Sequence, residues 1–271
     1  MRLCRIDDLQ SGMMLAGNLY LDDGRLLASN GAALTADGLN TLRGHGFTRV
    51  AIHEHGTDDI EIPLVISEGL QRDLGMRTRQ LFNFLRRKLA GYVDKPPTVI
   101  LASLRGPKVA QEFAKVDLYG PLEGLTDSLL VEVAGRPNLD GLGAVRRNDD
   151  LHVEHAINVS MASSVLGYQT RLSGQRRIEL ALGELRHDVG MIFVSNDTAE
   201  KPGRLTVAEM SRILAHPRLG YALLQLTTSS VWYVSNHVAL QHHERQDGQG
   251  YPRGLFGTNR VERIETELFD P

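Results

Sequence analysis

From Ser67 onward, apolar residues recur at helical intervals. Leu70, Leu74, Leu81 and Leu85 follow one another at spacings of four or seven, with arginines between them. Residues three or four apart lie on the same face of a helix, so this spacing predicts an amphipathic helix. Strand signals are nearly absent from the second half of the chain. The sequence therefore predicts an all-α bundle for that half.

Later helices are expected at six places, separated by breaks. Pro96 and Pro97 are expected to end the first helix, because proline lacks the N–H group that a helix interior needs. The stretch 97–125 is ambiguous and contains two glycine–proline breaks. The expected helices lie near residues 126–134, 138–146, 151–167, 176–190, 206–226 and 229–243.

The first sixty residues have a different pattern. Two apolar runs flank Asp22-Asp23-Gly24, which predicts a β-hairpin. Thr35 can cap a short helix, and residues 48–53 read as a strand. The expected fold is therefore mainly α, with a small N-terminal α+β domain before an all-α bundle. The expected domains are 1–62, a helical connecting region at 63–125, and a helical domain at 126–271.

The composition and net charge of the chain disfavour some classes of binding partner. Hydrophobic residues make up 42% and charged residues 23% of the chain, as in ordinary globular proteins. A net charge of −3 disfavours a general electrostatic grip on polymeric nucleic acid or an anionic membrane. The single cysteine, Cys4, fits a reducing compartment. With no recognisable signal peptide or membrane span, a cytoplasmic location is expected.

Three histidine clusters in the second half are weak signals when each is taken alone. His152 and His155 flank an apolar helical stripe, which is common for ordinary boundary residues. His187 is followed by Asp188, and this pair offers one imidazole nitrogen and one carboxylate that can bridge two ions. Pro217 disfavours the α conformation for His216, so that histidine is expected at a helix end or kink.

The fourth cluster, HHERQDGQGYPRGL, is a strong signal. His242 and His243 end a predicted helix, and a turn leads into Gly250-Tyr251-Pro252. Glycine permits close backbone approach, proline fixes φ, and tyrosine offers a ring with a hydroxyl group. A purely structural loop has no need of the His-His-Glu run before it.

The order H…HD…HP…HHExxDGxGYPxGL resembles the HD-GYP family, a branch of the HD phosphohydrolases that hydrolyses the bacterial messenger cyclic di-GMP. The resemblance covers about residues 126–255 and implies an HD-type helical bundle. The first sixty-odd residues resemble, more loosely, the small domain often found before such domains. The implied activity is hydrolysis of a cyclic dinucleotide to pGpG or GMP by a metal-bridging hydroxide.

The resemblance also implies the site residues. Two divalent transition ions, iron or manganese, would be held in a binuclear centre with Asp188 as the bridge. His187 and Asp188 would be the catalytic pair. The implied metal ligands are His155, His187, Asp188, His216, His242 and His243. The implied substrate-binding residues are Arg245, Asp247, Gly250, Tyr251, Pro252 and Arg253, with solvent contact as the alternative for the two arginines.

The chain departs from the family pattern at three places. Met191 stands where the family has a lysine at the substrate phosphate, and Leu151 stands where members with a third metal have a glutamate. The family continues into a V-A-D-like segment whose aspartate is a further ligand. Asp270 lies at about that separation but in a different context, so the domain is expected to be truncated.

These departures leave a second hypothesis open, a degenerate or truncated module that binds nucleotide or protein without turnover. An HD phosphohydrolase that acts on another nucleotide is a third. Signalling proteins or a second copy of the chain are possible partners. The basic helix near 72–88 is interpreted as a signalling or dimerisation element or, more simply, as a solvated surface.

Overall fold

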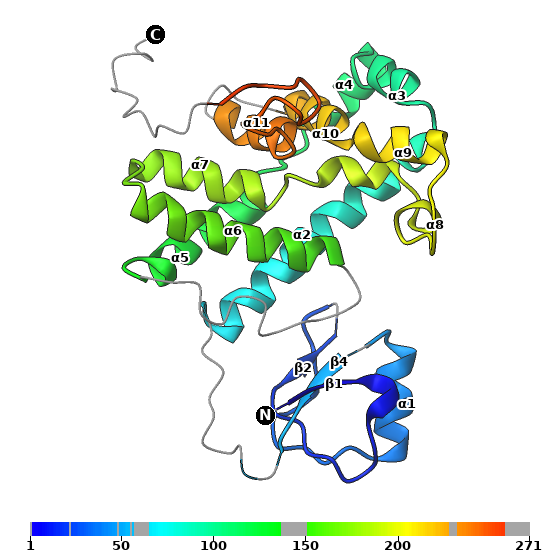
Figure 1. Cartoon of the computed structure of the whole chain (residues 1–271), viewed down its shortest axis with the longest axis vertical. Coiled ribbons are helices and arrows are strands. Elements are labelled where there is room, and N and C mark those ends of the chain that lie inside the picture. The colour runs from blue at the N-terminus through cyan, green and yellow to red at the C-terminus, as the bar shows by residue number, and fades with distance from the viewer. Residues whose placement is uncertain are drawn as a thin grey trace.

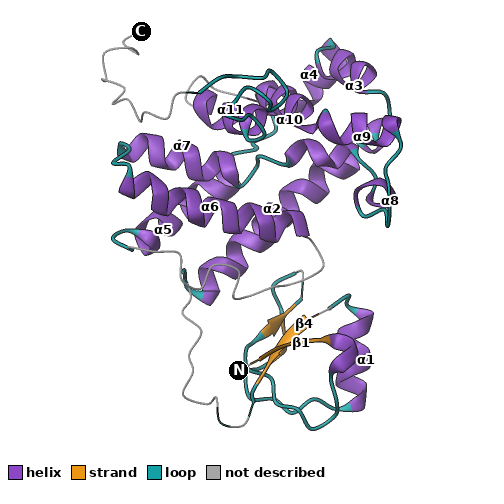
Figure 2. Ribbon diagram, in the orientation of Figure 1, coloured by secondary structure: helices purple, strands orange, loops and turns teal. Residues whose placement is uncertain are grey.

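The computed structural model describes residues 2–21, 23–47, 49–54, 56, 65–136, 151–227 and 232–257. A small strand-containing N-terminal unit precedes a helical bundle (Figure 1). Within the described ranges, every strand lies before residue 53 (Figure 2). The expected fold class is confirmed.

Two antiparallel ladders form the N-terminal unit. β1 (Arg2–Arg5) pairs with β4 (Arg49–Ile52), and β2 (Leu19–Tyr20) pairs with β3 (Leu26–Ala28). The β2–β3 hairpin turns at Gly24, whose φ of +84° lies in the left-handed region that favours glycine. The hairpin predicted around this glycine is therefore present.

One helix packs on these ladders. α1 (Ala36–Gly44) begins after Thr35, whose hydroxyl accepts a hydrogen bond from the Gly38 amide at 3.0 Å. Such a cap satisfies one of the free N–H groups at a helix start. Leu39 and Leu42 of α1 are buried in a core that the unit forms by itself.

The bundle follows after residue 65. Its helices are α2 (Glu68–Lys88), α3 (Pro97–Leu104), α4 (Pro107–Phe113), α5 (Gly120–Val133), α6 (Leu151–Gln169), α7 (Gly174–Glu184), α8 (Asn196–Ala199), α9 (Val207–Leu214), α10 (His216–Leu224) and α11 (Tyr233–Gln241). Short 3-10 turns occupy Ile6–Asp8, Ala90–Tyr92, Val189–Phe193 and Gln225–Thr227. Among the described residues, no helix combines the length and apolar character needed to cross a membrane.

A single apolar core joins these helices. Leu74 and Leu85 of α2, Phe113 of α4, Leu122 of α5 and Leu182 of α7 are at most 1% exposed and belong to one cluster. Each such side chain contributes roughly 1.5–3 kcal/mol relative to exposure. Residues 65–125 thus pack with the later helices, and the boundaries expected at 62 and 125 stay predictions.

The first long helix ends earlier than expected. α2 is capped by Ser67 and stops at Lys88, eight residues before Pro96. Pro97 instead lies at the start of α3, where the missing proline N–H has no helical partner to lose. The expectation that these prolines end the first helix is wrong.

Other helix bounds also differ. The helix expected at 206–226 is two helices, α9 and α10, separated at Ala215. The one expected at 176–190 ends at Glu184, so the His-Asp pair lies in the turn after α7. α5 begins at Gly120 instead of residue 126. The helix expected at 138–146 lies outside the described residues, as does Asp270.

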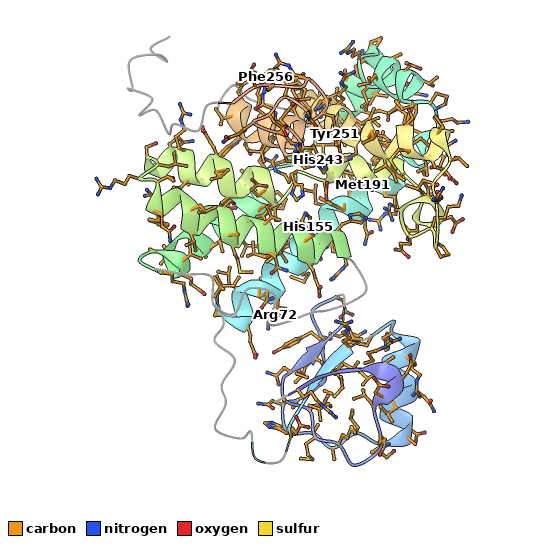
Figure 3. The ribbon with its side chains drawn as sticks, in the orientation of Figure 1. Arg72, His155, Met191, His243, Tyr251 and Phe256 are labelled. Atoms are coloured by element: carbon orange, nitrogen blue, oxygen red, sulfur yellow. The ribbon has the colours of Figure 1, made fainter. Side chains whose placement is uncertain are left out.

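The N-terminal hairpin contacts the first turns of α2. The Asn18 side-chain amide donates to the Glu68 carboxylate at 3.3 Å. The Arg72 guanidinium lies over the Tyr20 ring, 5.4 Å from its centroid. Figure 3 shows Arg72 where α2 faces the N-terminal unit. The long helix of the bundle core therefore also contacts the N-terminal hairpin.

Candidate metal centre

The carboxylate of Asp188 lies at the centre of a cluster of imidazoles. Its Oδ2 atom is 3.3 Å from Nε2 of His187. Its Oδ1 atom is 3.2 Å from Nε2 of His216 and 3.4 Å from Nε2 of His242. The two oxygens of one side chain therefore face different histidines. This is the arrangement expected of a carboxylate that bridges two ions.

Four separate segments bring these side chains together. His155 lies in the second turn of α6, and His216 is the first residue of α10. His242 and His243 directly follow α11. Figure 3 shows His155 and His243 in the same region of the bundle, with Tyr251 close to His243. The local sequence does not fix this convergence, which depends on how the helices pack.

Two glycines permit the closest of these contacts. A Cβ atom on Gly190 would collide with the carbonyl oxygen of His216, so the turn after Asp188 can lie directly against the start of α10. A Cβ atom on Gly183 would meet the Ser235 carbonyl at 2.8 Å, and this glycine lets α7 approach α11. Each close approach brings two ligand-bearing segments together.

A buried arginine anchors the turn that contains His187 and Asp188. Arg186 is fully buried, and its Nε donates to the Leu182 carbonyl at 3.0 Å. Its Nη2 donates to the Ser235 hydroxyl on α11 at 2.6 Å. The guanidinium lies over the Tyr119 ring at 4.1 Å. This side chain therefore ties the turn to α7, α11 and the segment before α5.

Three of the rings are oriented by the same backbone contact. Nδ1 of His187, His216 and His242 lies 2.7, 2.6 and 3.1 Å from the carbonyl oxygen three residues earlier in the chain. A carbonyl only accepts hydrogen bonds, so each Nδ1 carries the proton. In the neutral imidazole, Nε2 is then left with a free lone pair directed at the cluster. Metal-binding histidines are held in this way in many proteins.

The donors fit a pair of divalent ions. Nε2 of His216 and Nε2 of His242 are 3.0 Å apart, and both face the same carboxylate oxygen. The two Nε2 lone pairs and the anionic carboxylate oxygen repel one another. A cation bound between them would remove this repulsion. Two ligands about 2.1 Å from one ion lie roughly 3.0 Å apart at right angles and roughly 4.2 Å apart when opposite. The observed separations fall in this range.

The donor atoms form two overlapping sets. One contains His155, His187 and Asp188, and the other contains Asp188, His216, His242 and His243; within each set the atoms lie within 4.8 Å of one another. Imidazole-rich ligation suits iron or zinc better than magnesium. All six residues expected as ligands are thus brought together, while their role as ligands stays a prediction.

The cluster keeps Asp188 ionised. Burial favours the neutral carboxyl, but the imidazoles around it outweigh burial and hold the pKa of Asp188 well below its ordinary value. Those imidazoles belong to His152, His187, His216 and His242. At neutral pH the carboxylate at the centre of the cluster is therefore an anion.

The pKa values of the histidines in the cluster are shifted in opposite directions. Burial disfavours the charged form of His187, yet its contacts with Asp188 raise its pKa above the ordinary value. Burial, together with the neighbouring His242 and His216, lowers the pKa of His243 to about 4. Burial and nearby His187 likewise lower the pKa of His155. The rings of His155 and His243 are accordingly neutral near pH 7.

The Gly-Tyr-Pro loop packs against the cluster. The Tyr251 ring stacks on His243 with centroids 4.6 Å apart and planes 14° apart. Glu244 accepts the amides of Arg253 at 2.7 Å and Leu255 at 2.8 Å. A Cβ atom on Gly250 would collide with the backbone at Glu244, which explains the glycine there. The His-His-Glu run therefore shapes the loop as well as the cluster.

The residues expected to bind substrate surround this loop. Arg245 is paired with Asp247 at 2.6 Å, and Asp247 also accepts the Gln249 amide at 3.0 Å. Arg253 is exposed, and the neighbouring Pro252 carbonyl accepts from Arg218 at 2.7 Å. The loop is in place beside the cluster, and the substrate-binding role of these residues stays a prediction.

Sequence reasoning left two residues of the cluster unassigned. Nδ1 of His152 lies 3.9 Å from Oδ2 of Asp188. The Glu184 carboxylate lies 3.8 Å from Nδ1 of His187, and burial raises its pKa. The H-V-E-H spacing contained a usable signal, because residues three apart on a helix lie on one face.

Comparison with known proteins finds a family match over part of the chain. Residues 143–259 match the HD domain family. The cyclic di-GMP phosphodiesterase response regulator RpfG of Xanthomonas campestris is 37% identical over 99 residues, which cover 36% of this chain and 26% of that protein. The cyclic di-GMP phosphodiesterase PA4108 of Pseudomonas aeruginosa is 34% identical over 132 residues, or 48% of this chain and 32% of that protein.

A third relative carries a different substrate in its name. The 3'3'-cGAMP-specific phosphodiesterase 3 of Vibrio cholerae is 36% identical over 120 residues, covering 43% of this chain and 26% of that protein. The chain thus matches only a quarter to a third of the length of these relatives. We conclude that residues 143–259 of the chain match the HD domain family, and that its relatives include proteins named as cyclic di-GMP phosphodiesterases.

Proposed function

We propose that this chain is a metal-dependent phosphodiesterase that hydrolyses cyclic di-GMP to pGpG or GMP. One observation carries the proposal: the two oxygens of Asp188 face two different sets of imidazoles. The names of the relatives at 37% and 34% identity support cyclic di-GMP as the substrate. The HD domain and the histidine cluster support hydrolysis over simple binding.

His155 and His187 would hold one iron or manganese ion, and His216, His242 and His243 the other, with Asp188 shared. When bound, such a pair supplies an activated water and positive charge for the phosphoryl oxygens. Asp188 contributes a carboxylate that remains ionised, because its pKa is far below neutral pH. His216 and His242 contribute lone pairs whose directions are fixed by carbonyls of their own segments.

The loop after His243 would form one wall of the substrate cleft. Tyr251 lies over His243, so its ring separates the cluster from solvent on that side. Arg253 is exposed on the same loop, and its cation is available for a phosphate of the dinucleotide. Arg245 is less available, because its guanidinium is already paired with Asp247. Arg253 is therefore the better candidate of the two for phosphate binding.

A second function is favoured by Met191. This residue lies three positions after Asp188 and is 9% exposed. Its thioether offers no positive charge where negative charge develops on a phosphoryl group. We infer from this feature that a module that binds the dinucleotide without hydrolysing it is the alternative. Hydrolysis is the stronger proposal, because the six clustered donor residues have little purpose in a binding module without metal.

Metal analysis and a hydrolysis assay separate the two functions. Protein purified with ferrous or manganous ion should contain about two ions per chain. It should convert cyclic di-GMP to a linear product, and a chelator should abolish that activity. Parallel assays with 3'3'-cGAMP test the substrate named for the Vibrio cholerae relative.

Three variants connect activity with the cluster. His187→Ala and Asp188→Ala should abolish hydrolysis without loss of the helical circular-dichroism signal. His237→Ala is the matched control, because this ring contacts Tyr221 and Tyr233 instead of the cluster. Hydrolysis that survives both substitutions would overturn the proposed site. Tight binding of cyclic di-GMP to a metal-loaded protein without turnover would instead support the alternative function.

A further inference from the structure

Arg186 directly precedes His187 and Asp188, but its side chain contacts other parts of the bundle. The residue is fully buried, and its Nη2 donates to the Ser235 hydroxyl on α11 at 2.6 Å. Its guanidinium carbon lies 4.1 Å from the centre of the Tyr119 ring. The turn that carries two of the expected ligands is therefore held by residues that are not expected ligands themselves.

Tyr119 extends this link to a further helix. Its hydroxyl donates to the side-chain carbonyl of Asn236 on α11 at 2.8 Å. The same hydroxyl lies 3.4 Å from the carbonyl oxygen of Leu224, the last residue of α10. We call Arg186, Tyr119, Ser235 and Asn236 the Arg186 network, and all four residues are buried. The network thus joins the turn after α7 to both α10 and α11.

These three segments carry one complete donor set. The turn after α7 contains Asp188, His216 begins α10, and His242 and His243 follow α11. Figure 1 shows α10 and α11 next to each other at the top of the bundle, and the two helices are in contact. Both helices meet the Arg186 network near one end and place their histidines at the other. The network is therefore placed to fix the position of these imidazoles relative to the carboxylate.

The other donor set is held by different contacts. His155 lies on α6, whose Ser160 hydroxyl donates to the Ala181 carbonyl on α7 at 2.9 Å. The His187 ring is oriented by the Glu184 carbonyl, which is 2.7 Å from its Nδ1. Neither contact involves α10 or α11. A change in the Arg186 network should therefore displace the histidines of α10 and α11 relative to the turn, and leave this pair of histidines in place.

The fold alone does not account for an arginine at this position. Burial of a charge lowers stability unless its donors are paired, and Nη1 of Arg186 has no hydrogen-bond partner among the described residues. Apolar residues of similar volume often replace buried charges with no loss of stability. The forked guanidinium, in contrast, holds the Leu182 carbonyl and the Ser235 hydroxyl at the same time in a fixed geometry. The benefit of the arginine thus lies in the relative position of α7, α11 and the turn.

We propose that Arg186 is a positioning residue for one of the two metal ions, the ion that Asp188 and the histidines of α10 and α11 would hold. It acts through Ser235 and Tyr119, because these contacts fix α10 and α11 against the turn. The inference rests on the binuclear centre of the proposed function, but not on its substrate or on turnover. It predicts that loss of the Arg186 network weakens the binding of this ion and leaves the binding of the other ion unchanged.

Titration of metal-free protein with manganous ion tests the inference. Wild-type protein should show two sites, which His155→Ala and His243→Ala assign to the two donor sets. Arg186→Met keeps a long apolar side chain but has no donors. It should weaken the His243 site by about 10-fold, the lower end of the range for residues that orient metal ligands, and leave the His155 site unchanged. Ser235→Ala removes only the acceptor on α11 and should weaken the same site.

Two control variants should bind both ions as the wild type does. Thr126→Val removes a buried hydroxyl that donates to the Leu122 carbonyl within α5 at 2.8 Å. It therefore controls for the loss of a buried polar group in the same core. His237→Ala shortens a side chain on α11 that contacts Tyr221 and Tyr233. It controls for a general effect of substitutions on α11.

Further readouts distinguish positioning from a general loosening of the bundle. The melting temperature of metal-free Arg186→Met should be no lower than that of the wild type, because a buried charge is removed. The double variant with Ser235→Ala should bind the ion no more weakly than Arg186→Met alone, because the two substitutions remove one link. At an ion concentration that just fills both wild-type sites, electron paramagnetic resonance should show a spin-coupled manganese pair in the wild type and a larger share of isolated ions in Arg186→Met.

Several results would overturn the positioning role. These are equal weakening of both sites, wild-type affinity at both sites, and losses that multiply in the double variant. If Arg186→Met does not fold, Ser235→Ala and Tyr119→Phe each remove one hydroxyl of the network and decide by the same affinities.

The outcomes also separate this inference from the proposed function. Selective weakening of the His243 site in a protein that hydrolyses no cyclic dinucleotide would sustain the positioning role and overturn the enzyme. Hydrolysis of cyclic di-GMP by a protein whose ion affinities are unchanged in Arg186→Met and Ser235→Ala would do the reverse. A wild-type protein that binds no ion at all would overturn both.

Discussion

The Tyr251 ring lies flat on the imidazole of His243, with the two planes 14° apart. The Tyr251 amide also donates to the His243 carbonyl at 3.1 Å. The loop and the cluster therefore meet through one residue pair, in which backbone and ring contacts act together. Changes to the loop should therefore alter the affinity for the ion that His243 would hold.

Replacement of Tyr251 tests this link. Tyr251→Ala removes the stacking partner of His243, and stacked aromatic pairs contribute about 0.5–1.5 kcal/mol beyond burial. We expect manganous-ion affinity at the His216, His242 and His243 set to fall by several-fold. Tyr251→Phe keeps the ring and should retain wild-type affinity. Equal affinities in both variants, measured by calorimetric titration, would show that the stack does not support the site.

Glu244 should control the order of the Gly-Tyr-Pro loop. Its carboxylate accepts two backbone amides, those of Arg253 and Leu255. Glu244→Ala leaves both amides without this acceptor, and hydrogen exchange at these two positions should become faster. Glu244→Gln retains one carbonyl oxygen and should protect one amide. Unaltered exchange in the alanine variant would contradict this role.

Metal binding should depend on pH in a defined window. The pKa of His187 is raised above its ordinary value of 6.5, so a proton competes with the ion at and above that pH. Affinity should therefore rise with pH through the window above 6.5 and fall below it. His243, with a pKa of about 4, should compete only in acid. Titrations from pH 6 to pH 9 measure this, and a flat profile would refute it.

The turn at Gly190 lies so close to the start of α10 that no side chain should be tolerated at this position. Gly190→Ala places a Cβ atom against the carbonyl oxygen of His216 and 2.8 Å from the Gly220 amide. Such overpacking costs about 1–3 kcal/mol, and it should also displace His216 from Asp188. Denaturant unfolding of metal-free protein gives the first effect, and ion titration gives the second.

Gly124 provides the matched control. It lies within α5, and a Cβ atom there has no neighbour within 4 Å. Gly124→Ala should stabilise the protein by about 0.5–1 kcal/mol, because alanine loses less backbone entropy in a helix. A Gly190→Ala variant as stable as Gly124→Ala would mean that the turn can move away from α10 at little cost.

Local signals in the sequence were sufficient for several elements. Thr35 predicted the start of α1 through its cap, and the Leu70–Leu85 spacing predicted α2. The expectation that Pro96 and Pro97 end the first helix failed, because the same missing N–H that forbids a helix interior is harmless in the first turn. Pro97, Pro107 and Pro121 all lie at helix starts.

The site was predictable only in part. A motif resemblance, not residue spacing, indicated that His155, His187 and His242 belong together, since they lie on separate segments of the chain. Their convergence depends on contacts such as that of Gly190 with α10, which no local pattern specifies. The position of His152 beside Asp188 was not foreseen, because a histidine beside an apolar stripe is common in ordinary helices.

The carbonyl contacts at His187, His216 and His242 have a consequence for the fold itself. Because each ring is locked by its own segment, the chain cannot relax by turning the lone pairs away from one another. Without a cation the folded state therefore carries local frustration, of the kind that functional sites tolerate at the expense of stability. Binding of the metal ions should raise the melting temperature of the protein by more than the burial around the site would suggest.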